Sequence, residues 1–303
     1  MTGLAQCLHS SVDWGAGFAL YRLRHFERRN QNGDWPVEIC QERLPTTPWA
    51  HPATARLPGI QPAPLEEWLR VDEAYGAQMA HREWLLTHHR DEVIACQPHA
   101  QEAVEELYAA VMDKLPALGF TRAGGAWVCP DGRHVTEDSD QPLLTLGRLV
   151  QNDFCVHLQH PGAAEHHLAA AALCFPAGWR LSDKIGRPLT QIHVPVDPYD
   201  ESMARRVQRM FDALQPGRLL WRANALLYAD PELFAPRSSE HRRHQPKLGE
   251  AVWMRSERQV LRKLPETGAV VFTIHTYVIP VEKLTQAQLA SLKASPLWDT
   301  LLS

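Results

Sequence analysis

Sixteen histidines among 303 residues raise the question of a metal or cofactor site. A neutral imidazole binds transition metals and haem iron through one ring nitrogen, and it titrates near neutral pH. His193 belongs to the run Leu189–Val194, in which alternating residue types predict a strand that fixes the ring. The cations Lys184 and Arg187 precede this run. We interpret His193 either as a metal or haem ligand or as a histidine satisfied within the core.

A second histidine group has the spacing of metal ligands: His157, His160, His166 and His167. Pro161 and Gly162 predict a turn inside the group. We treat a zinc site built on His157, His160 and His167 as a hypothesis, with unliganded side chains as the alternative. Solvated side chains are expected for the histidines of helical or polar stretches, namely His81, His88, His89, His99, His241 and His244.

Arg222 and Asn224 interrupt the otherwise apolar run Leu219–Leu226, and alternation predicts that both lie on one face of a strand. A guanidinium group buried without a partner costs several kcal/mol. Arg222 is therefore expected to contact a carboxylate, a cofactor carboxylate or a bound oxygen species. A structural ion pair with an acidic residue is the alternative.

The segment Arg255–Pro265 carries four arginine or lysine residues around Glu257, and it leads into a strand predicted over Ala269–Ile279. Clustered cations can clamp carboxylates or phosphates, whereas a solvated charged face is the plainer interpretation. On the following strand, His275 shares one face with Thr273 and Tyr277. His275 belongs either to a polar site or to the edge of the sheet.

Several classes of function are disfavoured by composition and motifs. The formal net charge of −4 argues against a protein that tracks along nucleic acid. The six cysteines form no Cys-x-x-Cys pair, and signatures of zinc proteases, P-loop ATPases, serine hydrolases and dinucleotide-binding folds are missing. The longest apolar run, Leu168–Phe175, is far shorter than the ~18 residues of a spanning helix. We expect a soluble, cytoplasmic protein that does not bind membranes.

The periodicity predicts an α+β fold in which helices precede a mostly antiparallel sheet. Residues 1–62 form an irregular proline-rich segment, and residues 63–303 are expected to form one domain. Helices are predicted from Pro64 to Leu86, from Val104 to Leu118, from Met203 to Leu214 and from about Thr285. Strands are predicted at Leu143–Val150, Phe154–Leu158, Leu168–Phe175, Leu189–Val194, Leu219–Leu227, Val252–Met254 and Val270–Ile279.

Read in order, these motifs resemble the haem-dependent oxidative N-demethylase α-subunit family, long described as a domain of unknown function. The resemblance covers about residues 52 to 285. It rests on Leu65–Leu69 with Asp72 and Tyr75, Leu149–Asp153, Leu173–Pro176 with Trp179, Lys184–Leu189 with Ile192–His193, Arg222 with Asn224, Arg255–Pro265, and Thr267–Ile274 with Thr276–Tyr277. Two positions depart from the family pattern, Asn152 in place of an acid and Ala225 in place of tryptophan.

The resemblance implies a PAS-like sheet that cradles haem b. The implied reaction is a monooxygenase-type N-demethylation of a small secondary amine such as dimethylamine, with O2 and NADPH, to a primary amine and formaldehyde. Electrons would come from a partner reductase that carries FMN and an iron–sulfur cluster, and the resemblance leaves both a monomer and an oligomer open. A haem-binding, PAS-like gas or redox sensor without turnover is the alternative, and a non-haem zinc enzyme is a third hypothesis.

The resemblance also implies roles for individual residues. His193 would be the axial iron ligand, and Arg222 would be the distal donor to iron-bound oxygen. Candidates for cofactor binding are Lys184, Arg187 and Arg258, which would contact the haem propionates, together with Asn224. The matching acids, Asp153 and Glu257, would hold an ammonium substrate or move protons.

Overall fold

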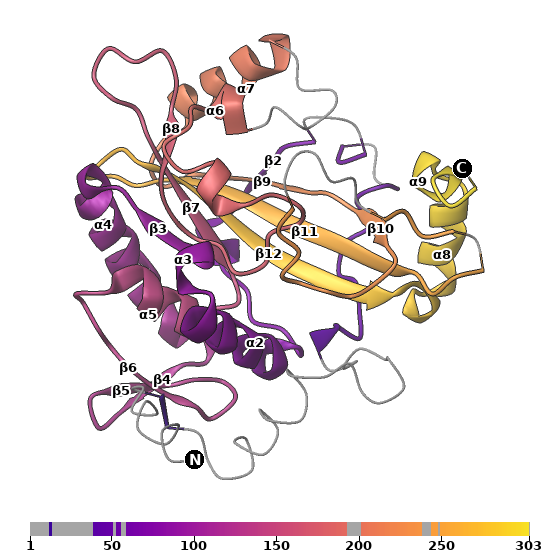
Figure 1. Ribbon diagram of the computed structural model, residues 1–303, viewed down its shortest axis with the longest axis horizontal. Helices are drawn as coiled ribbons and strands as arrows, with labels where there is room; N and C mark the ends of the chain where they lie inside the picture. Colours follow the sequence, from indigo (N-terminus) through magenta and orange to yellow (C-terminus); the bar gives the residue numbers. More distant parts are fainter. Residues whose placement is uncertain are drawn as a thin grey trace, which may run out of the picture.

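Two eleven-residue strands, β11 (Trp253–Lys263) and β12 (Val270–Pro280), form an antiparallel hairpin at the centre of the main sheet (Figure 1). The computed structural model describes residues 12–13, 39–50, 53–55, 59–192, 201–237, 244–247 and 249–302. Within these residues the fold is α+β, with an eight-stranded antiparallel sheet and helices packed on it. This confirms the predicted fold class.

The main sheet has the order β2-β9-β11-β12-β7-β8-β3, and β10 pairs with the first three residues of β11, Trp253–Arg255. The flanking strands are β2 (Gln61–Ala63), β3 (Ile94–Cys96), β7 (Asp153–Leu158), β8 (His167–Ala172), β9 (Leu219–Ala223) and β10 (Leu226–Tyr228). A smaller sheet of order β1-β6-β5-β4 contains β1 (Val12–Asp13), β4 (Thr121–Ala123), β5 (Ala126–Val128) and β6 (His134–Thr136).

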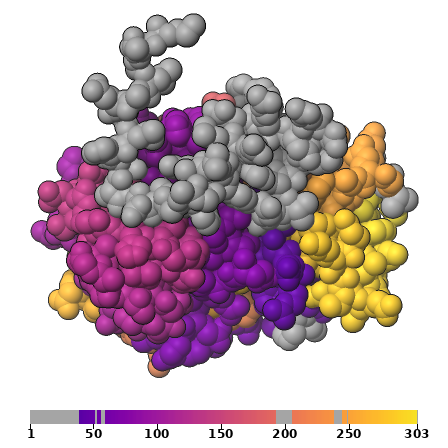
Figure 2. Space-filling view, turned by 90° about the horizontal axis from the view of Figure 1, so that it is seen from below, coloured from indigo at the N-terminus to yellow at the C-terminus, as the bar shows by residue number. Residues whose placement is uncertain are grey.

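Helices α2, α4 and α5 cover one face of the main sheet (Figure 1). The described helices are α2 (Tyr75–His88), α3 (Arg90–Val93), α4 (Gln101–Met112), α5 (Pro142–Leu149), α6 (Leu189–Ile192), α7 (Glu201–Ala213), α8 (Gln286–Lys293) and α9 (Pro296–Asp299), with 3₁₀ turns η2 (Leu65–Glu67), η3 (Pro98–Ala100), η4 (Leu115–Leu118), η5 (Leu181–Asp183) and η6 (Val281–Lys283). Seen from below, the segments between about residues 60 and 150 make a continuous surface beside the C-terminal helices (Figure 2).

Local sequence signals explain where several helices begin and end. Val104, Leu107 and Val111 recur at helical spacing on α4 and are all buried. Gly119 ends the following 3₁₀ turn with a φ of +89°, a conformation that glycine adopts without steric cost. Thr285 caps α8 in a reciprocal capping box with Gln288, so the predicted start of the C-terminal helix is confirmed.

Alternation along β11 and β12 sends neighbouring side chains to opposite faces of the sheet. Val260 and its cross-strand partner Thr273 face the core beneath α2, α4 and α5, where Trp68 Nε1 donates a hydrogen bond to Thr273 Oγ1 at 2.9 Å. Leu261 and Phe272 face the other side, against α6, α7 and the chain around Trp179. We call the first surface the helix face and the second the open face.

The helix face is anchored by a fully buried ion pair between Arg82 of α2 and Asp153 at the start of β7, with Nη1 and Oδ1 2.6 Å apart. Asp153 also accepts hydrogen bonds from the amides of Cys174 and Phe175, at 2.8 and 2.9 Å. The other guanidinium hydrogens of Arg82 are donated to three carbonyl oxygens, those of Gly147, Gln151 and Asn152. One side chain thus joins α2 to the end of α5 and to β7, and through Asp153 to the residues after β8.

The predicted strands at 154–158, 168–175 and 270–279 are confirmed, and the predicted strand at 219–227 is present as β9 and β10. The strand predicted at Leu143–Val150 is wrong, because this run forms α5. Leu143, Leu146 and Leu149 recur every three residues and are all buried, as expected for one face of a helix, and Pro142 at the first turn also favours a helix. The single helix predicted from Pro64 is also wrong, since η2 and α2 are separated by an irregular stretch.

The strand predicted over Leu189–Val194 is wrong for its described part, where α6 forms instead. The amides of Gln191 and Ile192 both donate to the Pro188 carbonyl oxygen, at 2.9 and 3.0 Å, and close a helical turn. Four residues are too few to distinguish a strand period from a helical turn that starts after a proline. His193 itself lies outside the described residues.

We predict that Arg82→Met lowers the free energy of unfolding by about 3–5 kcal/mol, because it leaves the Asp153 carboxylate buried without its cation. Urea unfolding followed by tryptophan fluorescence measures the change. The matched control is Arg122→Met, which removes the exposed pair with Glu137 and should cost at most about 1 kcal/mol. Equal losses in the two variants would contradict a special role for the buried pair.

Candidate functional site

Strands β9 and β11 bring three of the predicted site residues together on the open face. Arg222 lies opposite Gln259 in the register, and Glu257 is two residues along β11 on the same face. Asn224 follows β9, and its amide donates to the Glu257 carbonyl oxygen at 3.1 Å. The sequence prediction that Arg222 and Asn224 share a face thus holds, and the structure adds Glu257 to the pair.

The Glu257 carboxylate is held by polar neighbours and is 8% exposed. Its Oε2 accepts hydrogen bonds from Asn224 Nδ2 at 3.0 Å and from Gln259 Nε2 at 3.1 Å. Asn224 Oδ1 accepts in return from the Glu257 amide at 2.9 Å. Oε1 has only the longer contact to Arg255 Nε, at 3.5 Å, among the residues that the structure describes. Glu257 is thus fixed in place with one oxygen able to accept further hydrogen bonds.

The Arg222 side chain, in contrast to that of Glu257, makes no hydrogen bond within the residues that the structure describes. Its Nε is buried and has no hydrogen-bond partner among the described residues. Burial lowers the pKa of the guanidinium, and the charge of Glu257 acts in the opposite direction. Because an unpaired buried donor costs free energy, the arrangement favours an oxygen-rich or anionic ligand at this position.

An apolar row lies next to this polar group. Leu220, Leu261 and Phe272 are paired across β9, β11 and β12, and Ile274 lies opposite Gln259. The row packs against Trp179, Ile185 and Ile192 from the chain that leads toward residue 193. The open face therefore combines an apolar surface with an arginine and a carboxylate, which suits a planar, largely apolar cofactor.

Lys184 and Arg187 lie on the segment that covers the apolar row. Lys184 Nζ donates to the Ile192 carbonyl oxygen at 2.6 Å, and burial lowers the pKa of this amine, with Asp183 opposing the shift. Arg187 is exposed, and its Nη1 donates to Gln191 Oε1 at 3.4 Å. Both cations are thus within a few residues of the chain that carries His193.

The remaining predicted site residues lie elsewhere. Arg258 points to the helix face, where it donates to the Trp68 carbonyl oxygen at 3.4 Å and approaches Glu67 at 3.5 Å. Burial lowers its pKa to about 10, with the charge of Arg70 acting in the same direction. Asp153 is committed to the ion pair with Arg82. The structure does not bring either residue to the group formed by Arg222, Asn224 and Glu257.

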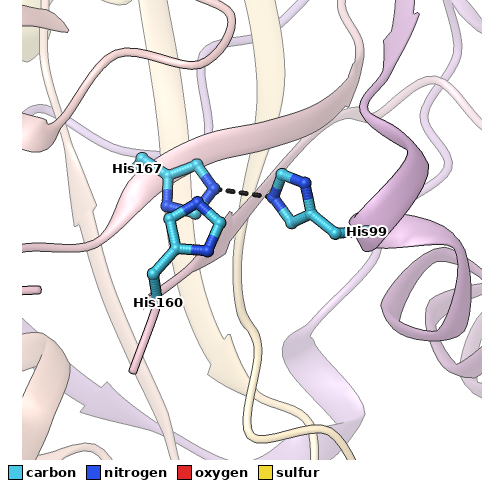
Figure 3. Close-up of side chains that lie close together, drawn as sticks. All are labelled: His99, His160 and His167. Atoms are coloured by element: carbon cyan, nitrogen blue, oxygen red, sulfur yellow. Dashed lines mark hydrogen bonds between the residues drawn. The ribbon is translucent and has the colours of Figure 1, made fainter. Parts of the chain in front are cut away.

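A cluster of three histidines lies at the ends of β7 and β8 (Figure 3), and two of its members, His160 and His167, belong to the group predicted from the sequence. His99, His160 and His167 have ring nitrogens within 4.8 Å of one another, and His99 Nε2 is 2.9 Å from His167 Nε2. Burial lowers the pKa of His167 to about 4, and its neighbours His160 and His99 act in the same direction. The zinc group predicted from His157, His160 and His167 is therefore corrected.

His157 and His166 point instead toward the Phe211 ring, with centroids 5.5 and 5.2 Å away. His99 replaces His157 as the third member of the cluster. Its side chain is exposed, as expected from the sequence, but it contacts His167. His99 lies far from His160 and His167 in sequence, and the antiparallel pairing of β3 with β8, which ends at Cys96 and Ala170, brings it near them. The linear spacing of the histidines therefore gives no signal for the contribution of His99.

A second unpredicted group surrounds Asp72 on the helix face. The carboxylate accepts hydrogen bonds from His275 Nε2 at 2.9 Å, from Gln41 Nε2 at 2.9 Å and from Gln151 Nε2 at 2.8 Å. Burial acts to raise the pKa of Asp72, but the contacts with His275 and the two amides outweigh it and lower the pKa. His275 is fully buried in the central strand, so it belongs to a polar site and not to the sheet edge.

The family model for haem-dependent oxidative N-demethylase, alpha subunit-like proteins matches residues 59–296. The chain belongs to this family. The match spans the main sheet, helices α2 to α8 and every predicted site residue. The family name gives the activity class, an oxidative N-demethylation that depends on haem and is catalysed by an oxidoreductase, and the term alpha subunit indicates partner subunits.

The open face of this family member carries the kinds of side chain that a haem group would contact. These are an apolar row, a buried arginine nitrogen with no partner in the described part of the chain, and two cations, Lys184 and Arg187, that precede residue 193 in the sequence. In addition, no helix within the described residues is both long and apolar enough to span a bilayer.

We predict that Asp72→Asn lowers the free energy of unfolding by about 1–3 kcal/mol at pH 7, because it replaces a charged hydrogen-bond acceptor. A carboxyl whose pKa is lowered by folding stabilises the protein above its unfolded pKa of about 3.9, and this contribution is lost as the pH falls through the folded pKa. The difference between wild type and variant should therefore shrink below about pH 4. Urea unfolding at several pH values measures it.

The control for this experiment is Asp91→Asn, which changes an exposed carboxylate in α3 and should leave the pH profile unchanged. If the difference in free energy of unfolding between wild type and Asp72→Asn stays constant from pH 7 to pH 3.5, the expected link between the lowered pKa of Asp72 and stability is contradicted.

Proposed function

We propose that this protein is the haem-binding subunit of a monooxygenase-type N-demethylase that acts on a small secondary amine such as dimethylamine. One methyl group leaves as formaldehyde, one oxygen atom of O2 becomes water, and NADPH supplies two electrons. A partner reductase with FMN and an iron–sulfur cluster would deliver these electrons. The observation that carries the proposal is Arg222, whose buried Nε lacks a hydrogen-bond partner in the described residues beside the Glu257 carboxylate.

A PAS-like cradle on the open face would hold the haem, and His193 would be the residue that ligates its iron. Haem, when bound, supplies the redox-active iron for oxygen chemistry. Lys184 and Arg187, on the segment before His193, are the cations that we assign to the propionates. Arg258 remains in the helix face beneath Trp68, and we do not place it in this cradle.

Arg222 would provide fixed donors toward the negative charge that develops when oxygen is reduced. A guanidinium group stays charged and presents several N–H groups, so it needs little rearrangement to stabilise such charge. The charge of Glu257 acts on Arg222, but Arg222 Nε makes no hydrogen bond within the described residues and can therefore donate one to a ligand.

Glu257 would bind the substrate ammonium and accept a proton from its nitrogen. A secondary ammonium carries two N–H donors and a positive charge. Oε1 of Glu257 can accept a hydrogen bond from one of these donors, and the carboxylate charge offsets that of the ammonium. Asn224 and Gln259 occupy Oε2 and thereby set the direction of the carboxylate. Asp153 cannot serve in this role while both of its oxygens are bonded to Arg82, Cys174 and Phe175.

The proposal is tested by haem reconstitution and by formaldehyde release from dimethylamine, with NADPH, a surrogate ferredoxin reductase and ferredoxin. We expect a Soret band in the wild type and its loss or shift in His193→Ala. In Glu257→Gln the band should stay, whereas kcat/KM should fall about 10²-fold because a counter-ion and proton acceptor is lost. Glu102→Gln, an exposed change on α4, is the matched control.

Absence of a Soret band in the wild type would contradict the proposal that the chain binds haem. An unchanged band in His193→Ala would contradict the assignment of His193 as the iron ligand. Binding of O2 or CO without formaldehyde release would favour the sensor instead of the demethylase.

We further predict opposite effects of two arginine substitutions on stability. Arg222→Leu removes a buried donor without a partner, so the haem-free protein should be as stable as the wild type or about 1 kcal/mol more stable, while kcat falls about 10²–10³-fold. Arg255→Leu removes hydrogen bonds to the carbonyl oxygens of Phe175, Glu232 and Leu233, and should cost about 3 kcal/mol. Urea unfolding and formaldehyde release measure both, and a similar loss of stability in the two variants would contradict the proposed role of Arg222.

A further inference from the structure

The cluster of His99, His160 and His167 is built by three segments that the main sheet holds side by side. His160 follows the last residues of β7, and His167 is the first residue of β8. His99 lies in η3, directly after β3, which pairs with β8 through Cys96 and Ala170. In Figure 3 the His160 ring stacks on His167, and His99 faces His167 from the other segment. The backbone around each ligand is thus anchored in the sheet or at its edge.

The spacing of the nitrogens suits one small ion. Zn²⁺ binds imidazole nitrogens at about 2.0–2.1 Å, which places two nitrogens of a tetrahedral site about 3.3 Å apart. In the cluster the closest pair, His99 Nε2 and His167 Nε2, is 2.9 Å apart, and all three ligand atoms lie within 4.8 Å of one another. Rotation of the exposed His160 side chain out of its stack on His167 would bring the three lone pairs onto one ion.

The contacts of His167 favour presentation of a lone pair to the cluster. Its Nε2 is directed at His99, and its ring also hydrogen-bonds to the backbone of Leu158. In metal sites the second ring nitrogen of a ligand is usually held by such a backbone or carboxylate contact, which fixes the tautomer. His160 stacks on His167 with centroids 4.1 Å apart and ring planes 11° apart, so its ring must rotate before its in-plane lone pair points at the same ion.

The solvent exposure of the three histidines indicates which further ligands would complete the coordination of the ion. His167 is buried, at 6% exposure, whereas His99 and His160 are exposed to solvent. An ion bound here would have three protein ligands and would complete its coordination with water. Neutral imidazoles select Zn²⁺, Cu²⁺ and Ni²⁺ over Mg²⁺ and Ca²⁺, which prefer oxygen ligands.

We propose that His99, His160 and His167 form a binding site for a borderline divalent transition-metal ion of the Zn²⁺ type. The site lies on the other face of the sheet from Arg222 and Glu257, although the backbone of His167 pairs with Pro188, next to Arg187. His167 is paired with Leu158, which packs against the core of the helix face, whereas Arg222 and Glu257 lie on the open face. The bound ion would join η3, and with it the start of α4, to the ends of the β7–β8 hairpin.

The proposal is tested by titrating Zn²⁺ into the tag-free, chelator-treated chain in competition with a chromogenic chelator. We expect one site in the wild type and an affinity at least about tenfold lower in each of His99→Ala and His160→Ala. Both side chains are exposed, so far-UV circular dichroism should show unchanged folding. His134→Ala, an exposed histidine on β6, is the matched control and should bind like the wild type.

A second readout is the visible spectrum with Co²⁺, whose d–d bands report coordination by nitrogen ligands in a site of low coordination number. These bands should be present in the wild type and in His134→Ala, and absent in the two cluster variants. The proposal is overturned if the wild type binds no more Zn²⁺ than a variant that lacks all three histidines, or if His134→Ala weakens binding as much as His99→Ala. Neither measurement depends on haem or amine turnover.

Discussion

The ion pair between Arg82 and Asp153 determines how the main sheet is fixed to its helices. It lies where α2, the end of α5, the start of β7 and the exit of β8 meet, and both partners are fully buried. Charges buried this deeply are tolerated only when hydrogen bonds satisfy them, and here three carbonyl oxygens and two amides do so. Since β7 pairs with β12, and β12 with β11, this contact also fixes the position of the open face.

Strict alternation along the β11–β12 hairpin then separates two kinds of polar chemistry. On the helix face, Arg258 lies opposite His275, which bonds to Asp72 beneath the helices. On the open face, Glu257 and Gln259 lie beside Arg222. Residues next to one another in sequence therefore belong to different environments. A substitution at Arg258 is expected to act through the packing around Trp68, whereas a change at Glu257 acts on the open face.

The sequence predicted the elements whose pattern is local and missed those that depend on pairing. Alternation correctly put Arg222 and Asn224 on one face, because a strand has a period of two whatever its neighbours are. It failed for Leu143–Val150, where the apolar run was interpreted as a strand although Leu143, Leu146 and Leu149 recur at the helical spacing of α5. The spacing of the histidines placed His160 and His167 in one group but missed His99, whose position depends on the register between β3 and β8. The family motifs carried the inference of haem, which periodicity alone does not contain.

Four arginines on β9 and β11 show how the surroundings, and not the residue type, decide function. Arg255 donates to three carbonyl oxygens, Arg258 approaches Glu67 and the Trp221 ring, and Arg262 stacks on Trp68 with its guanidinium carbon 4.0 Å from the ring centroid. Arg222 has neither a hydrogen bond nor a ring contact of this kind within the described residues. A buried donor without an acceptor lowers stability, and folding gives no reason to retain it. Arg255, Arg258 and Arg262 also have a buried nitrogen without a hydrogen-bond partner in the described residues, but each has the other contacts given above. Arg222 lacks such contacts within these residues, and this supports the proposal that it faces a ligand which accepts its hydrogen bonds.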